Sequence, residues 1–314
     1  GARANTKGKN AIAMGTDSKA ESETSMAIGT KSEATAVDAL AMGTQSKDYG
    51  ISAVALGRQA VANQQNAVAL GFDAGAYGLN AIAIGFSTDV NGEHSAAIGS
   101  DATATTDAVA VGHNALANGN SAIAIGKGAS SGIRNGLAIG VSANASEISS
   151  MATGANANAS EENAVALGNG AKSEHVGSVA LGSNSETEAA RGTSDALVNG
   201  YTFEGFAATH PNSTVSVGKS GAERTITNVA AGRVTSNSTD AINGSQLYKV
   251  QADVDKKANT DASNLTETDV SKWQEKLGTG TVTNGNTGLV TGDTVYKEIA
   301  KTNTTLDTKA NTGL

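Results

Sequence analysis

The sequence contains no cysteine, one proline and ten aromatic residues (Phe 4, Tyr 5, Trp 1) in 314 positions. The lack of cysteine excludes disulfides, thiol catalysis and thiolate metal sites, and it fits a secreted protein. So few aromatic residues cannot fill a broad globular core, which argues against an ordinary enzyme. Glycine far below one third with a single proline excludes collagen, and 39% hydrophobic residues are too many for a wholly disordered chain. We expect a thin, regular structure built from small residues.

The chain also lacks a basic patch and a long apolar run. Its net charge of -8 argues against binding to nucleic acid, because few cations are available to neutralise phosphates. A helix that crosses a membrane needs roughly 18 or more consecutive apolar residues, and the sequence has no such run. The N-terminus has no charged segment followed by an apolar one. We therefore expect that a signal peptide has been removed and that both ends were cut from a longer protein.

An internal repeat dominates the first part of the chain. Units such as AIAMG, VALG and AIAIG recur thirteen times, with eleven steps of 14 residues and one step of 13, between Gly99 and Gly112. The glycines that end the units are Gly15, Gly29, Gly43, Gly57, Gly71, Gly85, Gly99, Gly112, Gly126, Gly140, Gly154, Gly168 and Gly182. Tandem repeats of this kind indicate a solenoid in which each unit stacks on the next.

Alternation with period two within each unit predicts β-strands rather than helices. Each unit is expected to hold a strand of about five residues, a glycine bend, a second short strand and a polar turn, stacked in parallel roughly 4.8 Å apart. Larger apolar residues stand three and one positions before each glycine, such as Val54 and Leu56. We predict that these residues point into the coil and meet small residues of the second strand.

An alanine stands two residues before every repeat glycine. This column lies on the opposite strand face from the larger apolar residues, so we interpret it as a packed surface between separate chains, where only a methyl group fits. Repeat duplication without selection is the alternative. The predicted trimer contacts in this column are Ala13, Ala27, Ala41, Ala55, Ala69 and Ala83.

The repeat, with its ending GSVALGSNSETEA at 177–189, resembles the head and neck of trimeric autotransporter adhesins of the YadA-like group. The resemblance implies a mainly β fold, in which a left-handed parallel β-roll forms a homotrimer and continues into a neck and a short coiled-coil stalk. It assigns 1–182 to the head and 183–247 to the neck, where TVSVGKSGAERTITNVAAGRVTSNSTDAINGSQL at 214–247 resembles the completion of the neck. A head insert at about 190–213 contains YTFEGF. Arg191, Arg224 and Arg233 either pair with acids across the trimer or are solvated.

The pattern after the neck changes to helical spacing. Leu247, Val250 and Val254 are three and four residues apart, as in the seam of a coiled coil, and their segment is too short to form a stable isolated helix. We expect coiled-coil stalk at 248–258 and 289–314, with a connector at 259–288 that contains an amphipathic helix around Val270, Trp273 and Leu277. In the last segment Val295, Ile299 and Leu306 are expected to face inward.

Catalytic motifs are missing from the sequence. Histidine is the usual first candidate for catalysis, and four are present: His94, His113, His175 and His210. His113 follows the glycine of the short unit, and left-handed β-helix acyltransferases use a histidine, but those enzymes have six-residue repeats and no second catalytic group accompanies His113. No HExxH, GxSxG, P-loop or calcium-binding β-roll motif is present. We expect no enzyme, no metal and no cofactor.

Candidate binding residues are the few large side chains at outward positions. The residues just after the repeat glycines include Arg58, Phe72 and Phe86 in successive units, so we expect the two phenylalanines to stack on adjacent rungs. Tyr49 and Tyr77 lie in turns or on the outer face of second strands. Aromatic residues beside arginine are typical of interface hot spots, although a phenylalanine ladder can equally stabilise the strands or cover a trimer seam.

We therefore predict a bacterial cell-surface adhesin that attaches without catalysis through the lateral surface of its head. The resemblance implies attachment to the outer membrane through a C-terminal anchor outside this sequence. It also implies a host partner, either a CEACAM-type receptor or collagen, fibronectin or laminin, among which the sequence does not choose. The alternative is a structural spacer or a scaffold for autoaggregation or biofilm without a specific host ligand.

Overall fold

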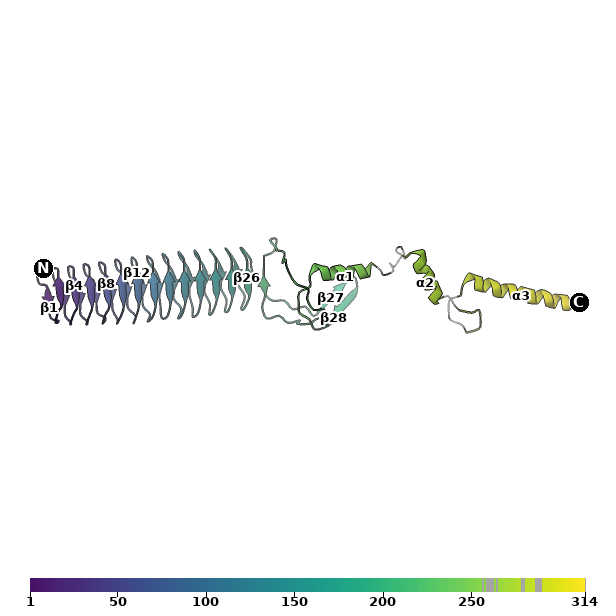
Figure 1. Cartoon of the computed structure of the whole chain (residues 1–314), viewed down its shortest axis with the longest axis horizontal. Coiled ribbons are helices and arrows are strands. Elements are labelled where there is room, and N and C mark those ends of the chain that lie inside the picture. Colours follow the sequence, from purple (N-terminus) through teal and green to yellow (C-terminus); the bar gives the residue numbers. More distant parts are fainter. Residues whose placement is uncertain (256, 258–262, 264, 278–279, 286–289, 314) are drawn as a thin grey trace. The chain divides into compact units, whose positions relative to one another are not determined.

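A computed structural model describes residues 1–255, 257, 263, 265–277, 280–285 and 290–313. The chain divides into two compact units, Gly1–Thr227 and Asn228–Leu314. The first unit is a parallel β-solenoid, as the repeat predicts, in which the rungs stack one above the next (Figure 1).

Each rung contributes one strand to each of two parallel sheets. The 13-stranded sheet contains the second, two-residue strand of each rung: β1 (Asn5–Thr6), β3 (Lys19–Ala20), β5 (Glu33–Ala34), β7 (Lys47–Asp48), β9 (Val61–Ala62), β11 (Gly75–Ala76), β13 (Asp89–Val90), β15 (Thr103–Ala104), β17 (Leu116–Ala117), β19 (Ser130–Ser131), β21 (Asn144–Ala145), β23 (Asn158–Ala159) and β25 (Lys172–Ser173).

The 14-stranded sheet contains the strands that precede the repeat glycines: β2 (Ile12–Met14), β4 (Met26–Ile28), β6 (Leu40–Met42), β8 (Val54–Leu56), β10 (Val68–Leu70), β12 (Ile82–Ile84), β14 (Ala96–Ile98), β16 (Val109–Val111), β18 (Ile123–Ile125), β20 (Leu137–Ile139), β22 (Met151–Thr153), β24 (Val165–Leu167), β26 (Val179–Leu181) and β29 (Val215–Ser216). The register pairs equivalent residues, for example Ala69 with Ala55 and Ala83.

The alanine column faces the interior of the single chain, so the predicted orientation of the repeat is wrong. Ala27, Ala41, Ala55, Ala69 and Ala83 are fully buried, and Ala13 is partly buried at the N-terminal end. The larger residues on either side of each alanine, such as Val54 and Leu56, face outward instead. Short turns join the two sheets at both edges, and the space between the sheets therefore accepts methyl and hydroxymethyl side chains but few larger ones.

Turns recur twice in every rung and hold a residue in the left-handed conformation. Asp17, Thr24, Lys31 and Asp38 have φ near +58° and are seven residues apart, which divides each rung into two similar halves. The rhythm changes once, because Asp101 and Asp107 are six residues apart. The residue that the short repeat unit lacks is therefore missing from the turn after β15.

The repeat glycines are required for two reasons. Gly71 has φ of +143°, a conformation that L side chains rarely adopt. A Cβ atom on Gly71 would also lie 2.1 Å from the carbonyl oxygen of Gly85 on the next rung. The same close stacking recurs at the other repeat glycines from Gly15 to Gly168, so this column sets the spacing of the solenoid along one edge.

One carboxylate interrupts the interior. Asp48 occupies a position that holds alanine in the rungs on either side, Ala34 and Ala62, and it is fully buried. It divides the buried apolar residues into one cluster that ends at Ala41 and another that begins at Ala53. Its oxygens accept hydrogen bonds from the backbone N–H groups of Leu40 (2.9 Å) and Gly50 (3.2 Å). Burial nevertheless raises the pKa of Asp48 to about 7, since the interior disfavours its charge.

The solenoid extends one strand beyond the thirteenth repeat. After an insertion that contains the hairpin β27 (Asp195–Val198) and β28 (Tyr201–Glu204), β29 pairs with β26 in the register of an ordinary rung. Arg224 closes this end, because its guanidinium donates hydrogen bonds to the hydroxyl of Ser185 (2.8 Å) and to the carbonyls of Val217 (2.6 Å) and Ser183. Arg224 thus bonds within its own chain and remains exposed, and its pairing across a trimer stays a prediction.

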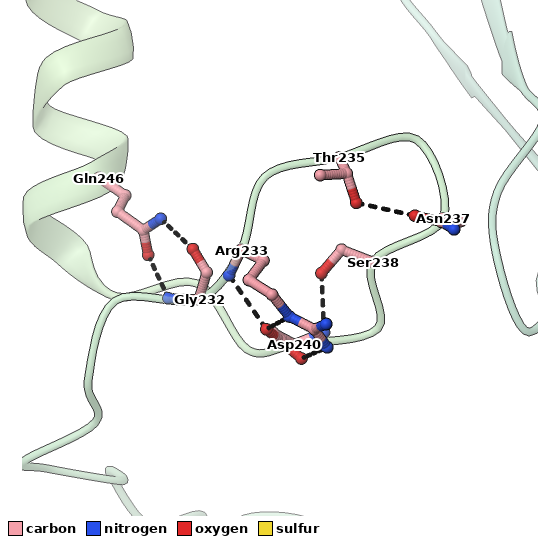
Figure 2. Close-up of polar contacts among 7 residues, drawn as sticks. All are labelled: Gly232, Arg233, Thr235, Asn237, Ser238, Asp240 and Gln246. Atoms are coloured by element: carbon pink, nitrogen blue, oxygen red, sulfur yellow. Dashed lines mark hydrogen bonds and ion pairs between the residues drawn. The ribbon is translucent and has the colours of Figure 1, made fainter.

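The second unit begins with a hydrogen-bonded loop and helix α1 (Gly244–Val254) (Figure 2). Gln246 joins loop to helix, because its side chain accepts a hydrogen bond from the N–H of Gly232 (2.9 Å) and donates one to the carbonyl of Gly232 (2.7 Å). The Arg233 guanidinium holds both carboxylate oxygens of Asp240, at 2.7 and 2.9 Å. Arg233 therefore pairs with an acid of its own chain, and pairing across a trimer stays a prediction. Asn243 caps α1 with a capping box.

Helices α2 (Glu267–Leu277) and α3 (Gly292–Thr312) follow, as the sequence spacing predicts. Leu247, Val250, Val254, Ile299 and Leu306 are exposed, and neither α1 nor α3 buries any residue within the chain. A third of the predicted connector at 259–288, together with the side chain of Leu277, lies outside the described residues. No described helix is both long and apolar enough to span a bilayer.

Gly71→Ala is expected to destabilise the solenoid by about 2–4 kcal/mol for two reasons. Alanine rarely adopts the positive φ of this position, and its methyl group would clash with the backbone of the next rung. Gly132→Ala is the matched control, since its added Cβ would have no neighbour closer than 3.6 Å. Thermal melting followed by circular dichroism compares the two variants. An equal effect of the two substitutions would contradict the stacking argument.

Asp48→Ala is expected to stabilise the solenoid, and by more at high pH than at low pH. Folding raises the pKa of Asp48 from 3.8 to about 7, so the folded state holds the proton more tightly than the unfolded state. The wild type should therefore lose stability as the pH rises from about 4 to about 7. Melting temperatures of both proteins at about pH 4 and about pH 8 measure this difference. Asp38→Ala, which removes an exposed turn carboxylate, should not reproduce it.

Candidate functional site

The two outer faces of the solenoid differ in chemistry. On the 14-stranded sheet, two columns of large apolar residues flank the buried alanines along the whole solenoid, interrupted by Ala96 and Thr153. Several of these side chains are 36–60% exposed: Ile12, Met14, Met42, Leu56, Leu70, Ile82, Ile98, Ile123, Ile125, Ile139 and Leu181. An exposed apolar stripe of this length marks an interaction surface.

The 13-stranded sheet presents mostly polar and charged side chains. Equivalent residues on adjacent rungs form ion pairs there, such as Lys19 with Glu33 (2.8 Å) and Lys172 with Glu186 (3.2 Å). The hydrogen bond from the Lys19 ammonium lowers the pKa of the Glu33 carboxyl below its ordinary value. This face is therefore suited to contact water or a polar partner.

Three of the sequence-predicted binding residues come together at one edge of the solenoid. The rings of Phe72 and Phe86 stack, with centroids 5.4 Å apart and an angle of 11° between the ring planes. The guanidinium of Arg58 lies 5.4 Å from the centroid of Phe72, within the range of a cation–π contact. Both phenylalanines remain exposed, at 38% and 53%. We call Arg58, Phe72 and Phe86 the aromatic column.

The two predicted tyrosines differ in environment. Tyr49 is held by its own chain, because its hydroxyl donates a hydrogen bond to Glu33 (3.1 Å). Burial, followed by that hydrogen bond, raises the pKa of Tyr49. Tyr77 instead lines a recess, where burial and the nearby carboxylates of Asp89 and Asp73 raise its pKa.

This recess beside the aromatic column was not anticipated from the sequence. It has a volume of about 180 Å³ and is lined by Asp73, Gly75, Tyr77, Ser87, Thr88 and Asp89. Gly75 creates it, since a Cβ atom there would lie only 2.4 Å from the ring of Tyr77. The signal in the sequence was a glycine at an outward strand position followed two residues later by tyrosine.

The histidines do not form a catalytic arrangement. His113 lies 3.9 Å from Asp101, and His94 lies 3.7 Å from Asp107, with all four side chains exposed at the turns around the short rung. Across the described part of the chain, no group of three or more His, Cys, Asp or Glu residues is placed to hold a metal ion.

Family comparisons match both units of the chain. The model of the YadA head domain repeat matches more than half of the sequence, at residues 7–32, 20–46, 49–74, 76–102, 106–129, 134–157 and 159–185. The model of the coiled stalk of trimeric autotransporter adhesins matches residues 225–270. This chain belongs to the YadA-like trimeric autotransporter adhesins. The family is one of non-enzymatic adhesins, which confirms the expectation that the chain is not an enzyme.

Individual relatives cover parts of the chain. Autotransporter adhesin BtaE of Brucella suis biovar 1 is 57% identical over 65 residues, which are 21% of this chain and 8% of the relative. The C-terminal YadA-like domain of a Burkholderia pseudomallei protein is 52% identical over 31% of this chain and 46% of its own, with a TM-score of 0.29. The collagen-binding domain of the Yersinia adhesin YadA is 26% identical, with a TM-score of 0.38, and the match covers 65% of this chain and 86% of that domain. The chain thus spans less than a tenth of BtaE.

Proposed function

We propose that this chain forms a homotrimeric head that attaches bacteria to a host protein through the outer face of the 13-stranded sheet and the adjoining edge. The observation that carries the proposal is the contrast between the two sheet faces. One face is an apolar stripe that needs to be covered, and the other is polar and holds the recess.

The apolar stripe supports packing between copies of the chain. Each copy presents the same columns, so three copies bury them against one another, as the trimeric character of the family suggests. Leu56, Leu70 and Ile98 are trimer contacts in this arrangement, in place of the alanines. Leu247, Val250 and Val254 continue as the seam of a coiled coil, which gives the short helix α1 the partners that it lacks within its own chain.

The proposed organisation follows the sequence boundaries. Residues 1–182 form the head, 183–247 the neck with the insert at about 190–213, and 248–258 and 289–314 the stalk on either side of the connector. The stalk holds the head away from the outer membrane, and the head binds the host ligand. A CEACAM-type receptor, collagen, fibronectin and laminin remain the candidate ligands.

The aromatic column is the proposed centre of ligand contact. Phe72 and Phe86 present two stacked rings that are 38% and 53% exposed. Aromatic residues with arginine carry much of the binding energy in protein interfaces. Three heads in one trimer offer three such columns, and simultaneous weak contacts then add to a high overall avidity.

Ile123→Asp combined with Ile125→Asp is expected to dissociate the trimer, because the two carboxylates would be buried in the seam without partners. Sedimentation equilibrium measures the mass of the assembly. Leu116→Asp, a large apolar residue changed to an acid on the other sheet, is the matched control and should leave the trimer intact. Trimers that persist in the double variant would contradict the proposed seam.

Phe72→Ser combined with Phe86→Ser is expected to weaken binding to the host ligand at least about tenfold, as for a hot spot. Binding is measured with immobilised collagen, fibronectin, laminin and CEACAM-type receptors. Val141→Ser is the control, since Val141 follows a repeat glycine in the same way and is 52% exposed. If the wild type binds none of these proteins while cells that display it still aggregate, the scaffold function replaces the host-binding one.

A further inference from the structure

The recess beside the aromatic column contains an incompletely satisfied carboxylate. Oδ1 of Asp89 is buried and has no hydrogen-bond partner, while Oδ2 accepts a hydrogen bond from Asn91 (3.2 Å). A buried polar atom without a partner costs free energy, commonly about 1–3 kcal/mol and more for a charged group. The Asp89 carboxylate thus keeps acceptor capacity that its own chain does not use, and the residue lines the recess.

Charge on this part of the sheet is also unbalanced. In the column of outward residues, Lys19 and Glu33 neutralise each other, whereas Asp89 follows Val61 and Gly75 and has no basic neighbour in the register. Within the described residues, none of the ion pairs involves Asp73 or Asp89. The recess therefore presents two carboxylates that no ion pair among the described residues neutralises.

The lining and the size of the recess together favour an organic cation. The ring of Tyr77 lies over Gly75 at one wall of the recess. The negative charge of the carboxylates and the quadrupole of the aromatic ring both attract a cation. A water molecule takes about 30 Å³ of liquid volume, so 180 Å³ is far larger than a bare metal ion needs. A planar guanidinium can bond to carboxylates through two N–H groups at once.

We infer that the recess formed by Asp73, Gly75, Tyr77 and Asp89 binds an arginine side chain of the partner protein, with the aromatic column receiving an apolar residue next to that arginine. Asp73 and Ser87 directly follow Phe72 and Phe86 in the sequence, which makes the recess and the column one continuous surface. The net charge of -8 favours the approach of a basic segment. The inference rests on the proposed function for the nature of the partner as a protein.

The test uses the trimeric protein labelled with 3-fluorotyrosine and two short peptides. One peptide is acetyl-Gly-Arg-Gly-Phe-Gly-amide, and the other carries citrulline, the neutral analogue of arginine, in place of arginine. The fluorine resonance of Tyr77, assigned with Tyr77→Phe, is expected to shift with the arginine peptide and not with the citrulline peptide. Asp89→Asn is expected to weaken the arginine response at least about fivefold, because it removes the charge that a guanidinium pairs with.

Asp101→Asn is the matched control, since Asp101 and Asp73 occupy the same turn position two rungs apart, and Asp101 does not line the recess. Its response to the arginine peptide should equal that of the wild type, and melting curves establish that each variant is folded. Equal responses to both peptides, or a shift of the Tyr77 resonance with calcium chloride alone, would overturn the inference. Host binding that still depends on Phe72 and Phe86 would show that the proposed function survives such a failure.

Discussion

The narrow interior of the solenoid is the constraint from which the other features follow. Two sheets joined by short turns at both edges leave room between them for alanine and serine, with Val90 and Thr88 among the largest side chains that are fully buried. Such small side chains exclude little apolar surface from water, so the interior alone supplies modest hydrophobic stabilisation. The larger apolar residues therefore lie outside, and in the proposed trimer other copies of the chain cover them. Folding and assembly are in this way coupled.

The same constraint explains why single residues at the interior and at the edges matter. The continuous backbone ladder ties each rung to the next, so a disturbance at Gly71 or Asp48 acts on its neighbours above and below. Repeat proteins of this kind depend on nearest-neighbour contacts, and their ends need closure. Arg224 supplies that closure at one end with hydrogen bonds to three residues.

The sequence predicted the architecture well but not which strand face is buried. Period two separates Ala55 from Val54 and Leu56 without telling which set points inward, and the usual rule that larger apolar residues are buried misled the assignment. The length of the turns decides which strand face points inward, because short turns leave room mainly for small side chains. A pattern of hydrophobicity does not give the width of the interior. The stack of Phe72 and Phe86 was predictable because an exact repeat converts sequence offset into position on adjacent rungs.

The recess was not predictable by the same rule, because it arises from a missing side chain. Gly75 stands where other rungs have an outward side chain, and the ring of Tyr77 lies over the space that this side chain would fill. The position of that ring, which forms one wall of the recess, is not visible in the sequence. The alanine and glycine columns fix the fold of the solenoid, so the outward positions of the polar face contribute little to its stability. Binding chemistry can therefore change from rung to rung while the scaffold stays the same. In the binding mode that we propose, departures from the repeat on the polar face, such as Gly75, Tyr77 and Asp89, determine ligand recognition without changing the fold.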